Sequence, residues 1–259
     1  MHDEADTDQQ RQRPHPPSRR AVLVEALLVF GASTLVCAAL WQLRAVSGFI
    51  NRNLQAFIAA IFLYVPTGLL LRRKEDFADY ALTVRPVKRG LLVFLVASAV
   101  VFPLFGVGFY FYYRAVCAAA SRGVALPAQL RNLCHRYVGG LAGARLRLPT
   151  SIEQVAGEFL VVALPEEYFF RGYLQSRLEV VWPSRRRLLG APVGYSLLVA
   201  AALFGLGHLL VDGDALRLAV FFPGLVFGWM RQATGSILAG VLFHASSNLV
   251  SRVLHDSFF

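Results

Sequence analysis

Long apolar segments separated by short polar connections account for most of the chain after residue 20. A transmembrane helix needs about 20 predominantly apolar residues. Seven segments meet or approach that length: residues 21–41, 54–71, 90–113, part of 152–182, 193–211, 216–230 and 233–253. The sixth is short and is interrupted by Pro223 and Gly224. This pattern predicts an all-α fold, a polytopic transmembrane helix bundle with six to eight spans.

Basic residues between the apolar segments indicate how the helices are oriented. Arg19 and Arg20 directly precede the first span, and the connections at 71–90 and 184–187 are also rich in Lys and Arg. Cytoplasmic loops of membrane proteins carry this excess. We therefore expect a multi-pass protein of the cytoplasmic (inner) membrane with a cytoplasmic N-terminus. Residues 1–20 are charged and contain no apolar run, which predicts a disordered cytoplasmic tail.

The segment 114–149 conflicts with this orientation. It falls on the outer side if there are seven spans, yet it holds Arg114, Arg122, Arg131, Arg136, Arg145 and Arg147. Long loops follow the positive-inside rule weakly. Either this loop escapes the rule, or a further span or a re-entrant element lies within it.

Composition agrees with a membrane protein and argues against other classes. The 259 residues are 56% hydrophobic and carry a formal net charge of +10. Since most basic residues lie between apolar segments, the charge calls for no nucleic-acid partner. The three cysteines, Cys37, Cys117 and Cys134, are odd in number and lack a Cys-x-x-Cys spacing, so we expect neither a disulfide framework nor a zinc ribbon. We interpret Cys134 beside His135 as an incidental loop pair rather than a thiol nucleophile.

Three clusters of polar residues interrupt the apolar C-terminal part of the chain. Ionisable side chains in membrane helices are costly and usually functional. The clusters contain Glu166, Glu167 and Arg171; Phe204 and His208; and His244 and Asn248. Phe204 is expected to stack one turn from His208, and Asn248 to lie one turn from His244, because residues four apart share one helix face. The clusters fall on three separate predicted helices, so the fold has to bring them together.

The spacing within the first cluster separates the two glutamates by role. Residues four apart share one helix face, so Glu167 is expected to pair with Arg171 and to leave Glu166 free for chemistry. Pro165 has two interpretations. It either kinks the helix or starts its inner half, and in the second case both glutamates lie in the first turn, where the helix dipole favours a carboxylate.

One carboxylate, two imidazoles and an amide in an apolar bundle can hydrolyse an amide without a covalent intermediate. Glu166 would deprotonate a water molecule that His208 also holds, and His244 with Asn248 would stabilise the oxyanion. A carboxylate and two histidines also form a known zinc ligand set. Asparagine is a poor zinc ligand and the chain has no His-Glu-x-x-His motif. The residues therefore favour a metal-free site with no cofactor, with zinc as the alternative.

The ordered set EExxxR, FxxxH and HxxxN, within about residues 150–253, resembles the CPBP (Abi or CAAX-protease-like) family of intramembrane proteases, which includes the type II CAAX prenyl endopeptidase. The resemblance implies a glutamic-type protease in which Glu166 is catalytic and Glu167 and Arg171 support it. It further implies that His208 holds the water and that His244 and Asn248 bind the oxyanion. Phe204 and Phe170 are expected to line the substrate groove or to support the site.

This resemblance divides the chain into the tail (1–20), N-terminal transmembrane helices and a loop (21–149), and the protease core (150–259). The expected function is hydrolysis of a peptide bond in a membrane-associated or C-terminal substrate segment, with a membrane protein or peptide and the lipid bilayer as partners. Richness in Arg, Ala and Leu indicates a bacterial source. Because bacteria generally lack protein prenylation, a CAAX-type substrate is not expected.

Two alternatives remain open: a non-catalytic family member that acts as a bacteriocin-immunity or membrane assembly factor, and a zinc-dependent version of the same protease. A transporter also keeps Glu and His in the membrane. It usually shows an internal repeat, and none is visible in this sequence.

Overall fold

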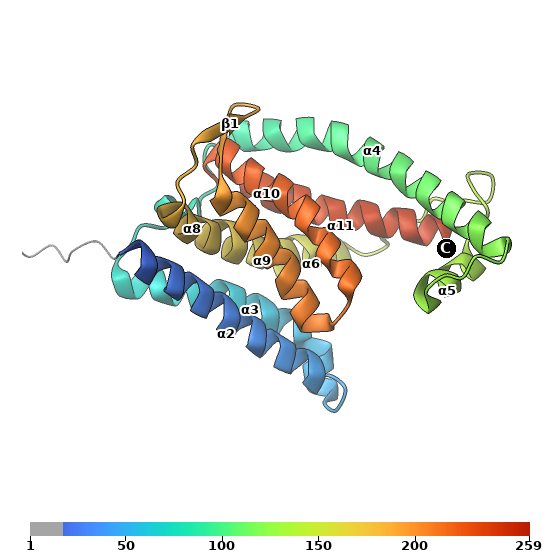
Figure 1. The fold of residues 1–259 in the computed structure, drawn as a ribbon, viewed down its shortest axis with the longest axis horizontal. Helices are drawn as coiled ribbons and strands as arrows, with labels where there is room; N and C mark the ends of the chain where they lie inside the picture. Colours follow the sequence, from blue (N-terminus) through green and yellow to red (C-terminus); the bar gives the residue numbers. More distant parts are fainter. Residues whose placement is uncertain (1–17) are drawn as a thin grey trace, which may run out of the picture.

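The computed structural model describes residues 18–259 (Figure 1). Most of the predicted tail, residues 1–17, lies outside the described residues, whereas Arg19 and Arg20 form the first turn of helix α2. Ser18 caps this helix by accepting a hydrogen bond from the backbone N–H of Ala21 (3.2 Å).

Helices account for nearly all regular structure in the described part of the chain. The first helices are α2 (Arg19–Leu43), α3 (Gly48–Arg73), the 3-10 turn η1 (Phe77–Tyr80), α4 (Val87–Ser121) and α5 (Ala128–Arg136). After a helix over 152–181, a two-stranded antiparallel hairpin, β1 (Arg186–Leu188) and β2 (Ala191–Val193), leads to α9 (Tyr195–Asp212), the 3-10 turn η4 (Ala215–Val220), α10 (Phe221–Thr234) and α11 (Leu238–Phe258). The all-α prediction is confirmed, and each of the seven apolar segments lies mainly in helix.

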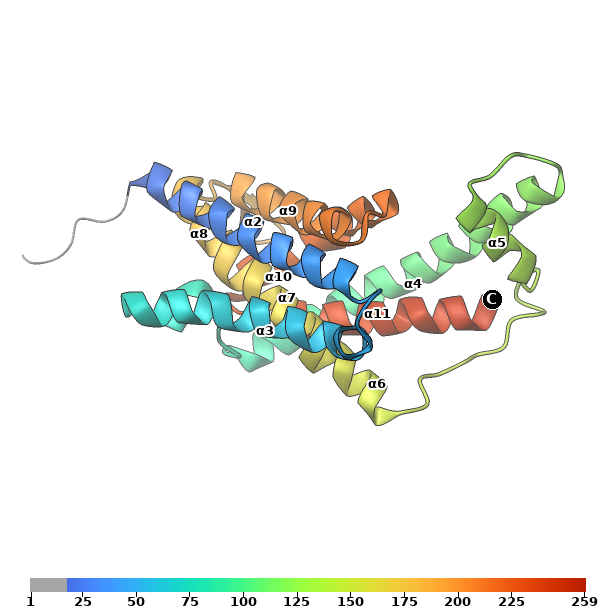
Figure 2. The same ribbon diagram turned by 90° about the horizontal axis from the view of Figure 1, so that it is seen from below.

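The helices surround the segment 152–181. Figure 2 shows it crossing between α2 and α3, and it also packs on α9 and α11. Its side chains Phe169, Tyr173, Leu174 and Leu178 are fully buried and form the centre of the hydrophobic core. Within residues 18–259, four helices are long and apolar enough to cross a membrane: α2, α3, α4 and α9. The central segment is less uniformly apolar because it carries the buried charges.

The segment 152–181 is one helix with two π-helical stretches. It consists of α6 (Ile152–Gly157), the π-helix η2 (Glu158–Ala163), α7 (Leu164–Glu167), the π-helix η3 (Tyr168–Leu174) and α8 (Gln175–Val181). The backbone stays helical on both sides of Pro165, at Ala163 and at Tyr168. Pro165 therefore does not start a helix, and the interpretation that placed Glu166 and Glu167 in a free first turn is wrong. π-helical turns within α-helices often mark functional sites.

Helix α4 lies at the edge of the bundle and packs mainly against α11 (Figure 1). Of its 35 residues only Gly90 is buried, where it lies against Leu238. At 1.5 Å per residue a helix of this length reaches about 52 Å, well beyond the roughly 30 Å of a hydrocarbon core. The helix therefore extends past one end of the bundle.

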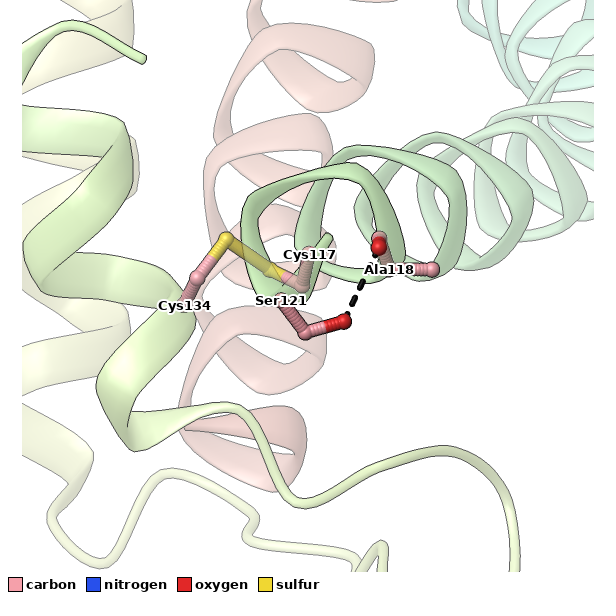
Figure 3. The surroundings of a disulfide bond; sticks show 4 residues. All are labelled: Cys117, Ala118, Ser121 and Cys134. Carbon is pink, nitrogen blue, oxygen red and sulfur yellow. Dashed lines mark hydrogen bonds between the residues drawn. A yellow bond between two sulfur atoms is a disulfide. The ribbon is translucent and has the colours of Figure 1, made fainter. Parts of the chain in front are cut away.

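At this end the structure corrects the cysteine prediction. Cys117 near the end of α4 and Cys134 in α5 form a disulfide with an S–S distance of 2.06 Å (Figure 3). Cysteine count and spacing did not reveal that α5 folds back against α4 and brings the two side chains together. Cys134 is consequently no thiol nucleophile, and Cys37 is free and buried. Figure 3 also shows Ser121, which ends α4 and donates a hydrogen bond to the carbonyl of Ala118 (2.9 Å).

The structure also excludes one of the possibilities for segment 114–149, a further membrane span. Among its described residues, α4 continues to Ser121 and the one further helix is α5, whose nine residues are too few to cross a membrane. A missed span is therefore excluded. Arg114 belongs to α4, Arg122 directly follows it, and the other arginines of this segment lie in α5 and in the connection that follows it, at the end of the bundle opposite the start of α2 (Figure 1).

Candidate active site

The three predicted polar clusters meet at one cavity of about 460 Å³. Its wall contains Glu166 from α7, Phe204 and His208 from α9, and His244 and Asn248 from α11. The remaining wall is mostly apolar, with contributions from α4 and α10 that include Phe102, Phe105, Phe222 and Val226. An apolar cavity with a few converging polar groups is the usual form of a small binding or active site.

His244 lies between the two adjacent glutamates. Its Nδ1 is 3.0 Å from Oε1 of Glu167, and its Nε2 is 3.8 Å from Oε2 of Glu166. Since a carboxylate accepts, Nδ1 donates its proton to Glu167, and this bond fixes the plane of the imidazole. The Nε2 atom then faces Glu166 in the cavity wall. Sequence spacing placed Asn248 one turn from His244 on the same helix, but it did not predict these contacts of His244 with the glutamates of another helix.

Glu167 is paired as the sequence predicted. Its Oε1 lies 3.2 Å from Nη1 of Arg171, and both side chains are buried. The guanidinium stacks over the rings of Phe204 (4.2 Å) and Phe227 (5.0 Å), and Nη2 donates to the carbonyl of Gly224 (3.3 Å). Buried charges require this kind of compensation, and cation–π contacts supply part of it.

Two glycines make room for this buried pair. A Cβ at Gly240 of α11 would lie 2.9 Å from Oε2 of Glu167, and one at Gly224 of α10 would lie 3.2 Å from Nη2 of Arg171. Both distances are shorter than ordinary van der Waals contacts. The two C-terminal helices can approach the charged side chains of the central helix only because these positions have no side chain.

Glu166 differs from its neighbour. Its side chain is 15% exposed and lines the cavity, whereas that of Glu167 is fully buried. Oε2 of Glu166, like Oε2 of Glu167, makes no hydrogen bond with any described residue. A buried polar atom without a partner is uncommon and needs an explanation. Since Glu166 also lines the cavity, its free oxygen is available to a molecule that enters.

His208 is held by its own helix. Its Nδ1 lies 2.9 Å from the carbonyl oxygen of Phe204, and its ring packs edge to face on the Phe204 ring at 4.6 Å. A carbonyl only accepts, so Nδ1 carries a proton and Nε2 is the atom left for other partners. The predicted contact one turn apart is thus present, and it sets the tautomer of the histidine.

Asn248 has a partner that the sequence analysis missed. Its Nδ2 donates to Oε2 of Glu158 (3.1 Å), and Arg252 donates to the other carboxylate oxygen (2.7 Å). Glu158 lies in the first π-helical stretch, two turns before Glu166. The signal was available, because Glu158 is an ionisable residue inside a predicted span.

The two predicted aromatic residues have different positions. Phe204 lines the cavity and contacts Arg171, whereas Phe170 is absent from the cavity wall. The ring of Phe170 packs edge to face on Phe30, Phe62 and Phe204 in the core. Its position fits a supporting residue and not a substrate-lining one.

The part of the chain that forms this site is similar to a known protein family. Residues 149–250 match the family described as Rce1-like, type II CAAX prenyl endopeptidase. This region is an Rce1-like domain. The recognition of a CPBP/CAAX-protease-like family is thereby confirmed, and the family indicates a protease. A search of curated proteins and a search of solved structures found no match to the chain.

The Rce1-like domain contains Glu158 and every polar residue of the cavity wall except Ser251. Helices α2 to α5 precede it, so α4 adds an apolar wall to the cavity from outside the matched region.

The donor set of the domain fits a metal ion poorly. Within residues 18–259, no three His, Cys, Asp or Glu side chains are gathered as metal ligands require. Nδ1 of each cavity histidine is already bonded, His244 to a carboxylate and His208 to a carbonyl. We therefore derive no catalytic step through zinc.

Proposed function

We propose that this chain is an intramembrane endopeptidase of glutamic type, in which Glu166 activates the attacking water. The observation that supports this most is the unpartnered Oε2 of Glu166 in a cavity that also holds His208, His244 and Asn248. The match of this region to a protease family adds to it. The substrate is a membrane-associated or C-terminal peptide segment, consistent with the apolar walls of the cavity.

In the proposed reaction, Glu166 accepts a proton from water as the oxygen forms a bond to the scissile carbonyl carbon. His208 holds the same water through Nε2. The proton on Glu166 then passes to the leaving nitrogen as the C–N bond breaks, which gives a carboxylic acid and an amine. Atoms and charges balance without a cofactor.

His244 and Asn248 would stabilise the oxyanion. With Nδ1 donating to Glu167, His244 can donate to the oxyanion from Nε2 when that nitrogen also carries a proton. Asn248 donates one amide N–H to Glu158 and keeps the second for the substrate oxygen. Fixed donors of this kind contribute about 2.7–4 kcal/mol each to transition-state stabilisation in other hydrolases.

The disulfide supports the proposed orientation in a cytoplasmic membrane. Disulfides persist in oxidising compartments, and Cys117–Cys134 lies at the end of the bundle opposite the start of α2 (Figure 1). We propose that this end faces outward and that the N-terminus is cytoplasmic, which agrees with the basic residues at the start of α2 and in the hairpin.

The test is a comparison of membrane proteomes, with C-terminal peptide mapping, between cells that carry the wild-type protein, Glu166→Gln or His208→Ala. We expect one or more new C-termini in the wild type that both variants lack. Glu153→Gln, an exposed change in the same helix, is the matched control and should cleave normally. Cleavage at wild-type levels in both site variants would refute the mechanism and favour a non-catalytic role.

Metal independence needs its own measurement. Activity in isolated membranes should survive exhaustive chelation, because the proposed reaction uses protein groups alone. Loss of activity on chelation and its return with added zinc would instead support the metal-dependent alternative.

A further inference from the structure

A second cavity of about 690 Å³ lies at the end of the bundle where α2 begins. Its wall is built from the end of α8, the β1–β2 hairpin, the start of α9 and two residues of α10, together with Arg19 of α2. It shares no lining residue with the candidate active site. Neither the family match nor the proposed protease function accounts for it.

The polar part of this cavity is strongly basic. Arg19, Arg185 and Arg186 contribute to its wall, and none of its described lining residues is acidic. In the part of the chain that the structure describes, none of these three arginines forms an ion pair with a carboxylate. Guanidinium groups match the geometry of phosphate oxygens and bind them in pairs of hydrogen bonds. Three uncompensated arginines therefore favour an anionic ligand.

The remaining wall is aromatic and apolar. Trp182, Tyr195 and Trp229 contribute rings, and Leu197, Leu198 and Leu225 contribute aliphatic surface. Trp229 donates its indole N–H to the carbonyl of Leu188 (2.9 Å), which fastens the hairpin to α10. Tryptophan and tyrosine concentrate at the boundary between headgroups and hydrocarbon, so this cavity has the composition expected at that depth.

Exposure indicates that the apolar wall continues onto the lipid-facing surface. Tyr195 is 72% exposed and Leu198 is 45% exposed at the start of α9, a helix apolar enough to span the membrane. A soluble phosphate compound would leave this surface unused. A molecule with a phosphate at one end and an acyl chain at the other would use both parts of the wall.

We propose that this cavity binds one anionic phospholipid, with its phosphate at Arg185, Arg186 and Arg19 and an acyl chain along Leu197 and Leu198. Basic pockets between transmembrane helices on the cytoplasmic side are known to bind such headgroups. The lipid would join α2, α10 and the hairpin that connects α8 to α9. Its binding should therefore stabilise the folded protein against thermal unfolding.

The experiment measures the thermal unfolding of the purified full chain in detergent with added phosphatidylglycerol, phosphatidylcholine of the same acyl chains, or inorganic phosphate. A ligand that binds only the folded state raises the unfolding temperature with its concentration. We expect a rise of several degrees with phosphatidylglycerol and little change with the other two. An equal rise with phosphatidylcholine or with inorganic phosphate would overturn the proposal.

Two variants test whether the rise in unfolding temperature comes from lipid bound in this cavity. The double variant Arg185→Gln/Arg186→Gln should lose the rise produced by phosphatidylglycerol. Arg187→Gln removes one charge from the same hairpin but outside the cavity wall, and it should retain the rise. If the double variant keeps the full rise, or if Arg187→Gln loses as much, charge attraction to the whole surface explains binding and the site does not exist.

Tryptophan fluorescence provides a second measurement that does not depend on unfolding. The chain has three tryptophans, and Trp41 lies at the far end of α2. In a Trp41→Phe background the remaining two, Trp182 and Trp229, both line the cavity. Brominated phosphatidylglycerol at low mole fraction should quench them strongly, and Arg185→Gln/Arg186→Gln should abolish most of that quenching. Equal quenching in the double variant would contradict a bound headgroup at these arginines.

Discussion

Glu25 and Glu166 are both glutamates within apolar helices, and their carboxylates have opposite surroundings. Glu25 accepts hydrogen bonds from four donors: Arg73 through both Nη atoms (2.8 and 2.5 Å), Tyr173 (2.7 Å) and Arg177 (2.9 Å). Both of its oxygens are satisfied, and it lines neither of the two cavities. Glu166 has one oxygen with no hydrogen-bond partner in the described chain, and that residue lines a cavity.

The difference separates a structural glutamate from a candidate catalytic one. Glu25 joins α2 to α3 and to the central helix, so it holds three helices in register. Glu166 joins nothing in this way, because the structural ion pair belongs to its neighbour Glu167. A buried charge with a partner is therefore weak evidence for function, whereas an unsatisfied one beside a cavity is a stronger indication.

The largest expected effect is the difference between removing the charge of Glu166 and removing the charge of Glu25. Glu166→Gln should reduce cleavage by about 100-fold or more, because general acid–base groups typically contribute 10²–10⁴-fold. Its Tm should change little, since Oε2 of Glu166 makes no hydrogen bond that the change would remove. Glu25→Gln should lower the Tm by several degrees by weakening contacts to two arginines, with nearly normal cleavage per folded molecule.

Cleavage assays at matched concentrations of folded protein, together with thermal unfolding, separate the two effects. The comparison fails if Glu25→Gln abolishes cleavage in protein that remains folded, or if Glu166→Gln unfolds the chain as much as Glu25→Gln does.

A smaller effect is expected at the glycine that accommodates the structural pair. Gly240→Ala would bring a methyl group to within 2.9 Å of Oε2 of Glu167, and overpacking of this kind costs about 1–3 kcal/mol. Gly68→Ala in α3 is the control, because a Cβ there meets nothing within 4 Å and alanine favours the helix. Thermal unfolding should show a loss only for Gly240→Ala. Equal Tm values for the two variants would mean that α11 adjusts freely around Glu167.

Glu158 is intermediate between the structural Glu25 and the candidate catalytic Glu166. It is bonded like Glu25, to Asn248 and Arg252, but its partner Asn248 lines the cavity. Glu158→Ala should release the amide of Asn248 and reduce turnover about tenfold, equivalent to about 1.4 kcal/mol. Glu158→Gln keeps an acceptor and should restore most of the activity with an unchanged KM. If Glu158→Gln is as impaired as Glu158→Ala, the negative charge beside Arg252 is what turnover requires, and the position of Asn248 is not.

Local spacing predicted contacts within a helix well. The pairs Glu167–Arg171 and Phe204–His208 are present as the four-residue spacing indicated. For contacts between helices, the sequence predicted only that the three polar clusters lie close together, and it did not identify the pairs of side chains in contact. The bond from His244 to Glu167, the role of Glu158 beside Asn248 and the Cys117–Cys134 disulfide all depend on which faces of distant segments pack together.

The sequence by itself determined the helical membrane fold, the seven apolar segments and the residues of the polar clusters. These follow from hydropathy and from the helical repeat, which act over a few turns of chain. Only the tertiary structure decided that the helix continues through Pro165 and that His244 lies between two glutamates. It also decided that Arg185 and Arg186 line a cavity with two tryptophans. The physical reason is that packing between helices selects one face of each, and this selection is made by side chains that are distant in the sequence.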